Sequence, residues 1–189
     1  MALDVYEHAP ADEAFRPRAN RLGMWIFLFS EAFLFAAFIS ARFVTSGTDR
    51  PEHLNQKLAL IITIVLLASS ISAFLAEAAI AHGNRKLFLR YINVTLLLGL
   101  LFLGGVGLEW TEGLADFPPG TSYGSAFFTL IGLHAFHVFT GLVAILVVRH
   151  LGRGGYFDSD DYWGVEGVIK YWHFVDVAWV IIYPTLYLF

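Results

Sequence analysis

The sequence predicts an all-α, polytopic membrane protein with a bundle of five transmembrane helices. Of its 189 residues, 57% are hydrophobic and only 15% are charged, whereas soluble domains carry about 45–50% apolar and about 25% charged residues. The apolar residues gather in five blocks of about 20 residues or more, the length that a helix needs to cross a bilayer. This composition excludes a disordered chain, a nucleic-acid-binding protein and a small secreted domain.

The first three blocks are separated by short segments that hold turn formers and charge. Residues 22–43 form the first expected span and carry Glu31 near their middle. Residues 58–81 form the second, whose only charged residue is Glu77, and residues 87–108 form the third. The sequence Gly-Asn-Arg-Lys between the second and third spans predicts a tight helix–helix connection.

The last two blocks complete a single transmembrane domain. Residues 125–148 contain no Asp, Glu, Lys or Arg, and residues 168–189 are apolar but for a few polar positions. No connection is long enough for a soluble domain, so we expect one domain over residues 22–189. Residues 1–21 are expected to form a polar N-terminal tail.

The basic residues predict the orientation of the bundle. Nine of the 12 Lys and Arg residues lie in the N-terminal tail and in or beside the second and fourth connections, and three lie on the other side. Because connections rich in Lys and Arg stay in the cytoplasm, we expect a cytoplasmic N-terminus and a C-terminus on the periplasmic, or outer, side.

Five ionisable residues are expected at depth in the membrane, where each is a functional-site candidate because an ionisable group is costly there. At about 1.5 Å per residue, Glu31, His134 and His137 all fall near the middle of the bilayer. His173 and Asp176 fall in the inner half of the fifth span. We therefore expect a buried polar network of these five residues, with Glu31 bonded to a histidine of the fourth span.

Two interpretations of this network stay open. The residues either carry or store a proton, or they join helices through polar contacts, which is the commoner role of such groups. A stand-alone proton or solute carrier built on Glu31 and the histidines is an alternative of a different class. So is a haem-bearing anchor like cytochrome b, although the histidine depths match poorly.

Other residues are expected at helix ends or at the membrane surface. Glu77, Glu109 and Arg42 are the helix-end polar residues, and the Arg42 side chain is expected to extend to the outer head groups. The candidates for contact with lipid or the interface are Trp25, Trp172, Arg85 and Lys86. No metal site and no catalytic residue is expected, because the chain has no cysteine and HxxH supplies only two ligands.

Five segments of the chain, in this order, resemble subunit III of the haem-copper respiratory oxidases, the cytochrome c oxidase subunit III family. They are SEAFLFAAFISARF (30–43), LLASSISAFLAEAAIAHGNRK (66–86), GLEWTEG (107–113), YGSAFFTLIGLHAFHVFTGL (123–142) and YWHFVDVAWVIIYPTLY (171–187). The last is the most specific. The resemblance implies a short, five-helix bacterial form of a family whose longer members add two helices that help to enclose phospholipid.

The resemblance also implies a function. The chain would be a non-catalytic subunit without haem or copper, packed on catalytic subunit I, with subunit II and other subunits in the same complex of the bacterial plasma membrane. That complex takes electrons from cytochrome c, reduces oxygen to water and pumps protons, and subunit III sustains proton uptake and stability. Subunit III of a quinol oxidase, or an accessory protein of a nitric oxide reductase system, remain alternatives.

Overall fold

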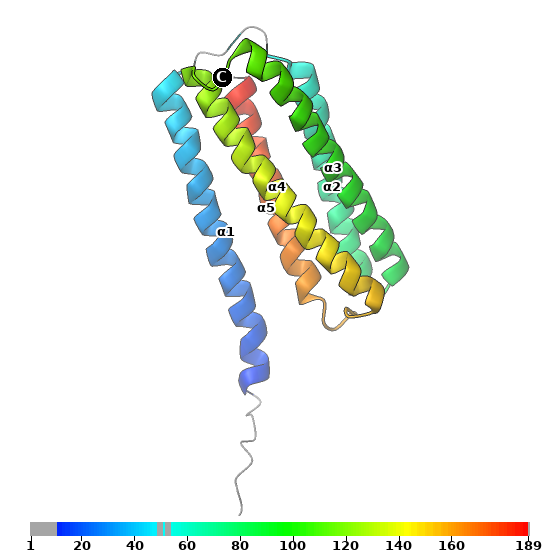
Figure 1. The fold of residues 1–189 in the computed structure, drawn as a ribbon. Helices are drawn as coiled ribbons and strands as arrows, with labels where there is room; N and C mark the ends of the chain where they lie inside the picture. Colours follow the sequence, from blue (N-terminus) through cyan, green and yellow to red (C-terminus); the bar gives the residue numbers. More distant parts are fainter. Residues whose placement is uncertain (1–10, 49–50, 52–53, 189) are drawn as a thin grey trace, which may run out of the picture.

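The structure is an all-α bundle, as predicted (Figure 1). The computed structural model describes residues 11–48, 51 and 54–188, with side chains from residue 18 onward. The helices are α1 (Ala11–Ser46), α2 (Gln56–Ala81), α3 (Arg85–Asp116), α4 (Ser122–Gly154) and α5 (Trp163–Tyr187). Several of them extend beyond the predicted spans; α1, for example, begins 11 residues before residue 22.

Local sequence signals explain four of the helix ends. The side chains of Asn55, Asn84 and Thr121 accept hydrogen bonds from the free N–H groups in the first turns of α2, α3 and α4, which is the usual role of a residue at this position. Gly155 ends α4 with a φ of 83°, a left-handed conformation that costs glycine little. The short connections therefore hold neighbouring helices antiparallel.

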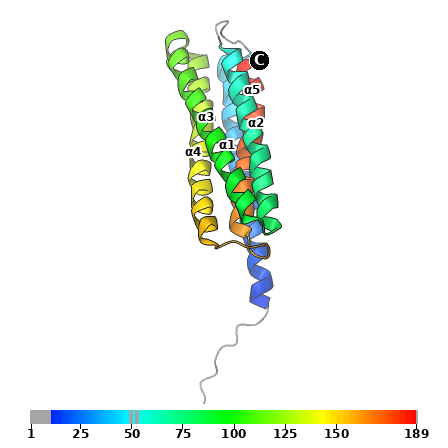
Figure 2. The same ribbon diagram turned by 90° about the vertical axis from the view of Figure 1, so that its right-hand side faces the viewer.

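The helices form three groups (Figures 1 and 2). α2 and α3 pack closely as a hairpin, α4 and α5 lie in the centre, and α1 lies on the outside against α4 and α5. In the described part of the chain, α1 contacts neither α2 nor α3. Among the α1 side chains that the structure describes, from Arg18 onward, only Leu28, Phe35 and Arg42 are buried. Their seven-residue spacing is that of a narrow helix–helix seam.

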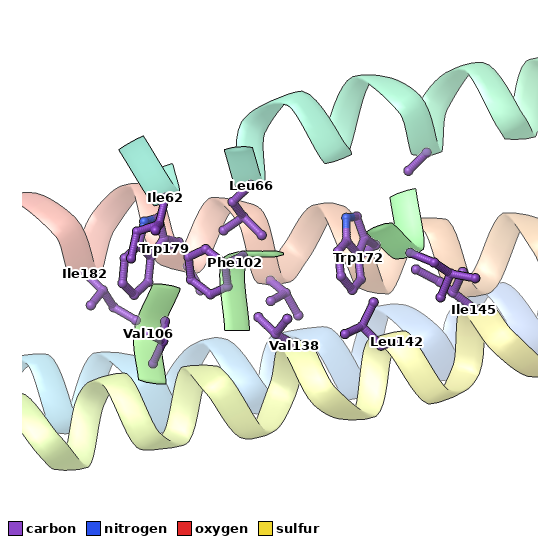
Figure 3. Packing of buried hydrophobic residues seen from close by; sticks show 14 of the residues in the cluster. Ile62, Leu66, Phe102, Val106, Val138, Leu142, Ile145, Trp172, Trp179 and Ile182 are labelled. Atoms are coloured by element: carbon purple, nitrogen blue, oxygen red, sulfur yellow. The ribbon is translucent and has the colours of Figure 1, made fainter. Parts of the chain in front are cut away.

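The core is built around two tryptophans of α5 (Figure 3). Trp172 is fully buried, because Gly99 of α3 and Gly141 of α4 leave room for its ring: a Cβ on either glycine would lie 2.8–2.9 Å from ring carbons. The prediction that Trp172 anchors the chain at the membrane interface is therefore wrong. Trp179 is also fully buried, and its ring meets that of Phe102 edge to face.

Four helices, α1 to α4, are long and apolar enough to cross a membrane, with α1 counted from Arg18. Large apolar side chains cover their outward faces; Phe33, Ile71 and Leu101 are each more than half exposed. α5 has 25 residues but is not among these four helices, and its sequence contains Lys170 and Asp176. It nevertheless packs along α2 and α4.

Side chains of other helices bind the last turn of α5. Gln56 at the start of α2 donates to the carbonyl of Tyr187 at 3.0 Å, and the Tyr123 hydroxyl of α4 donates to the carbonyl of Leu186 at 2.7 Å. The last carbonyls of a helix have no partner within it, so these two bonds complete the end of α5 and fix its register in the bundle.

Candidate functional site

The predicted contact between Glu31 and the fourth span is present. Oε2 of Glu31 lies 3.0 Å from Nε2 of His137, and Nδ1 of His137 lies 2.7 Å from the carbonyl oxygen of Leu133. The His137 side chain is 7% exposed and that of Glu31 is 20% exposed. The contact joins α1 to α4 near the middle of both helices.

The chemistry of this contact requires a proton. A carbonyl oxygen can only accept, so Nδ1 of His137 carries the hydrogen that it shares with Leu133. The bond between Nε2 and Glu31 therefore joins either an imidazolium to a carboxylate or a neutral imidazole to a carboxylic acid. In both cases Glu31 and His137 together hold one proton between the facing atoms.

A second set of hydroxyls joins this contact to α5. The Tyr171 hydroxyl lies 2.9 Å from Oγ1 of Thr140 and donates to the backbone carbonyl of His137 at 3.2 Å. Thr140 donates to the same carbonyl at 3.0 Å. Neither Tyr171 nor Thr140 was singled out from the sequence, because a lone hydroxyl in an apolar run gives no sign of its partner.

His134 lies apart from this contact. Its side chain is fully buried, and neither ring nitrogen has a hydrogen-bond partner among the described residues. Rings surround it instead: the centroid of Trp179 is 4.7 Å away and that of Phe102 is 5.6 Å away. The two histidines of HxxH therefore point to different neighbours, His137 to α1 and His134 to the core.

His173 and Asp176 form a third group, between α5 and α2. Nδ1 of His173 lies 2.7 Å from Oγ of Ser70 and 3.8 Å from Oδ2 of Asp176. The Asp176 side chain is 4% exposed, so its carboxyl group lies inside the protein beside His173. The five residues predicted as one network thus lie as two pairs and one isolated histidine.

Hydroxyls of α2 bind the two core tryptophans. Nε1 of Trp172 donates to Oγ of Ser69 at 3.0 Å, and Nε1 of Trp179 donates to Oγ1 of Thr63 at 2.9 Å. On the same helix, Ser72 bonds to Thr95 of α3 at 2.8 Å. The small residues of α2 thus allow close packing and also supply the hydrogen-bond partners that buried indole groups require.

The predicted helix-end residues differ in their surroundings. Arg42 is fully buried, so the expectation that it extends to the head groups is wrong: its guanidinium donates to the carbonyl of Gly47 and lies 5.3 Å from the Tyr123 ring centroid. Glu109 is 4% exposed and lies beside the Tyr187 hydroxyl. Glu77 is half-buried near the end of α2.

The predicted surface residues other than Trp172 are exposed. Trp25 is 58% exposed, and Arg85 and Lys86 are exposed at the start of α3. The Arg85 guanidinium lies beside Gly155, at the end of α4. These three positions are therefore free to meet lipid or another protein.

An ion-pair cluster that the sequence did not reveal ties α1 to the start of α5. Glu166 accepts from Lys170 and lies 3.4 Å from the Arg21 guanidinium. Both cations lie over the ring of Trp163, at 5.8 Å for Arg21 and 5.5 Å for Lys170. The spacing of Glu166 and Lys170, four residues apart in a helix, was the available signal.

The connection between α4 and α5 carries an acidic turn outside the spans. Oδ1 of Asp158 accepts from the N–H groups of Asp161 and Asp160, at 2.8 and 2.9 Å. These two bonds lower the pKa of the Asp158 carboxyl below its usual value, because they stabilise its charged form.

No group of three or more His, Asp or Glu side chains suited to a metal ion occurs within the described residues. Several polar side chains inside the bundle do bind one another across helix boundaries. Long apolar helices with outward-facing apolar side chains, joined by buried polar contacts, define the chain as an integral, polytopic membrane protein.

Comparison with known proteins identifies the family to which the chain belongs. Residues 11–189 match the family described as Cytochrome c oxidase subunit III. The chain is 35% identical over 179 residues to "Cytochrome c oxidase subunit 3" of Ornithorhynchus anatinus, a match that covers 88% of this chain and 68% of the relative. It is 34% identical over 177 residues to the protein of the same name from Alkalihalophilus pseudofirmus, covering 88% and 85%. The chain belongs to the cytochrome c oxidase subunit III family and is thus part of a respiratory oxidase complex.

Proposed function

We propose that this chain is the non-catalytic subunit III of a haem-copper terminal oxidase that takes electrons from cytochrome c, reduces oxygen to water and pumps protons. In this role it packs on catalytic subunit I, beside subunit II and other subunits, and sustains proton uptake and the stability of the complex. Haem and copper belong to those partners. The observation that carries the proposal is the use of the buried polar groups: Glu31 with His137, and Trp172 with Ser69, join helices to one another.

The membrane arrangement is part of the same proposal. α5 forms the fifth span, because it runs beside α2 and α4 and its end is held by their first turns. The N-terminus then lies in the cytoplasm and the C-terminus outside, in agreement with the excess of Lys and Arg on the inner side. The relative from Alkalihalophilus pseudofirmus supports the plasma membrane of a bacterial cell as the location.

Phospholipid is the proposed further partner. A hollow of about 560 Å³ between α1, α4 and α5 is lined by Asn20 and Trp163 and by apolar side chains such as Phe27 and Ala144. A wall that offers both polar and apolar side chains suits a lipid head group and an acyl chain. The site lies within the five described helices, so it does not require the additional two-helix arm.

Purification of the native complex tests the function. A tag on this chain, used to isolate the complex from membranes in mild detergent, should recover haem-bearing subunits with a Soret absorption band and cytochrome c-dependent oxygen consumption. Complexes that lack the chain should start at a normal rate and lose activity faster during turnover. Recovery of the chain without haem protein, or proton flux by the chain alone in liposomes, would contradict the proposal.

A further inference from the structure

Glu109 is a buried acid that the contacts described above do not use. It follows Phe102 and Val106 along the buried face of α3, and only 4% of its surface is exposed. Both carboxyl oxygens are shielded from solvent, and neither forms a hydrogen bond of good geometry with any residue that the structure describes. A buried polar group in this state is costly, so something other than a protein donor must satisfy it.

The other two acids inside the bundle each have an imidazole beside them. Oε2 of Glu31 lies 3.0 Å from Nε2 of His137. Oδ2 of Asp176 lies 3.8 Å from Nδ1 of His173. Glu109, in contrast, has no ion pair with any Lys, Arg or His in the described part of the chain. A carboxylate without a counter-charge is strongly disfavoured in a protein interior, and such a group becomes neutral instead.

Phenol groups are the neighbours of Glu109 on the side of α5. The Tyr187 hydroxyl lies beside the carboxyl, and Tyr187 is fully buried. The ring of Tyr183 stacks on that of Tyr187 at 5.2 Å, and the Tyr123 hydroxyl bonds to the carbonyl of Leu186. Phenols are neutral at neutral pH, so none of them supplies a positive charge, but a hydroxyl can share a proton with a neutral acid.

A second acid links Glu109 to the membrane surface. Glu112 lies three residues further along α3, on the same side of the helix, and it is exposed. Its Oε2 accepts a hydrogen bond from Nδ2 of Asn55 at 2.9 Å. Glu112 is therefore ionised in contact with water, and its charge acts on Glu109 from one turn away. Like charges at this spacing repel, which favours a proton on the buried acid of the two.

We propose that Glu109 is a proton-binding site: its carboxyl is a neutral acid that shares its proton with the Tyr187 hydroxyl and exchanges it with water through Glu112. In the exchange step an O–H bond breaks at Glu109 and one forms at Glu112, whose proton then passes to water. The negative charge moves inward in this step, and the reverse steps return a proton to Glu109. The inference does not depend on the proposed oxidase function or on the orientation of the bundle.

Infrared spectroscopy of the full-length chain in lipid vesicles tests the site. A protonated carboxyl group has a C=O stretching band that a carboxylate lacks, so the difference between wild type and Glu109→Gln at neutral pH should show one such band. Glu112→Gln is the matched control on the same helix and should remove none, because Glu112 is ionised. Tyr187→Phe retains Glu109 and should shift the band to higher frequency, because the acid loses the hydroxyl with which it shares the proton.

Transfer into heavy water tests the exchange route. The band of the neutral acid should move to lower frequency as a deuteron replaces the proton. Glu112→Gln should slow this change while leaving the band itself in place. Asp116→Asn is the control, because it removes another exposed acid near the end of α3, and it should leave the rate unchanged.

The outcomes decide both parts of the proposal. Absence of the band from the Glu109→Gln difference, or a band that appears only after sodium is removed from the buffer, would overturn the proton-binding site and indicate a carboxylate with a bound cation. An unchanged exchange rate in Glu112→Gln would overturn the route through Glu112. None of these measurements uses haem protein, so their result is separate from the test of the proposed function.

Discussion

Replacing Glu31 is the most direct perturbation of the polar contacts. Glu31→Gln keeps a donor that can face Nε2 of His137, because the Gln amide N–H can bind a neutral imidazole. The contact then changes from one that shares a proton to an ordinary neutral hydrogen bond. Hydrogen bonds to charged groups contribute about 1.5–3 kcal/mol and neutral ones about 0.5–1.5 kcal/mol. If the pair is an imidazolium and a carboxylate, Glu31→Gln therefore costs about 1 kcal/mol.

Glu31→Ala should cost more than Glu31→Gln. It leaves Nε2 of His137 without a partner, and the His137 side chain is only 7% exposed. An unsatisfied buried group costs about 1–3 kcal/mol. The expected order of stability is therefore wild type, then Gln, then Ala. Ser30→Ala is the neighbouring control, since the Ser30 hydroxyl donates to the carbonyl of Phe27 in the same helix.

The assay follows unfolding of the purified chain in nonionic micelles as SDS is added, by tryptophan fluorescence, together with turnover of the assembled complex. Both Glu31 variants should keep oxygen reduction while losing subunit III more readily during turnover. Equal stability of wild type and Glu31→Ala would refute the contribution assigned to the contact. Complete loss of oxygen reduction in a fully assembled Glu31→Gln complex would refute the supporting role.

Three further predictions concern packing, a core hydrogen bond and orientation. Gly99→Ala should destabilise the chain by about 1–3 kcal/mol in the same unfolding assay, because the added Cβ would lie 2.7–2.8 Å from Leu142 and Trp172. Gly104→Ala is the control and should not change the stability, because a Cβ at Gly104 meets no atom within 4 Å. Thr63→Val should cost about 1–3 kcal/mol, because it leaves the buried Nε1 of Trp179 without its partner. Trp179→Phe should cost more, because it also removes part of a fully buried ring. The double variant should cost less than the sum, which a double-mutant cycle measures. Gly120→Cys should react with a membrane-impermeant maleimide added outside intact cells, since the chain has no other cysteine; labelling only after permeabilisation would reverse the orientation.

The helices could be predicted from the sequence because each apolar block is a local feature. The Glu31–His137 contact could also be predicted, since equal depth in two helices is enough to bring two side chains to one level. The contact of Ser70 with His173 could not, because nothing in either segment indicates that α2 and α5 are neighbours. Trp172 was misplaced for the same reason: the space for its ring comes from glycines of α3 and α4.

The second source of error was a cationic side chain that was expected at the membrane surface and instead lies buried in the bundle. Arg42 lies near the end of α1, where snorkelling to the head groups is the usual expectation. It follows Leu28 and Phe35 at seven-residue spacing, however, so it lies on the face of α1 that packs against the bundle. A seam of this kind overrides the tendency of a long cationic side chain to seek the membrane surface.

The weak packing of α1 gives its polar contacts their importance. Between helices in a bilayer there is no hydrophobic driving force, because lipid tails are as apolar as the side chains. α1 buries few side chains, yet polar groups bind it along its length: Arg21 to Glu166 near the inner end, Glu31 to His137 near the middle, and Arg42 over Tyr123 near the outer end. Its position relative to α4 and α5 therefore depends on these contacts. Loss of the Glu31 contact should therefore loosen α1 from α4 and α5, so this one buried contact bears on the stability of the whole subunit.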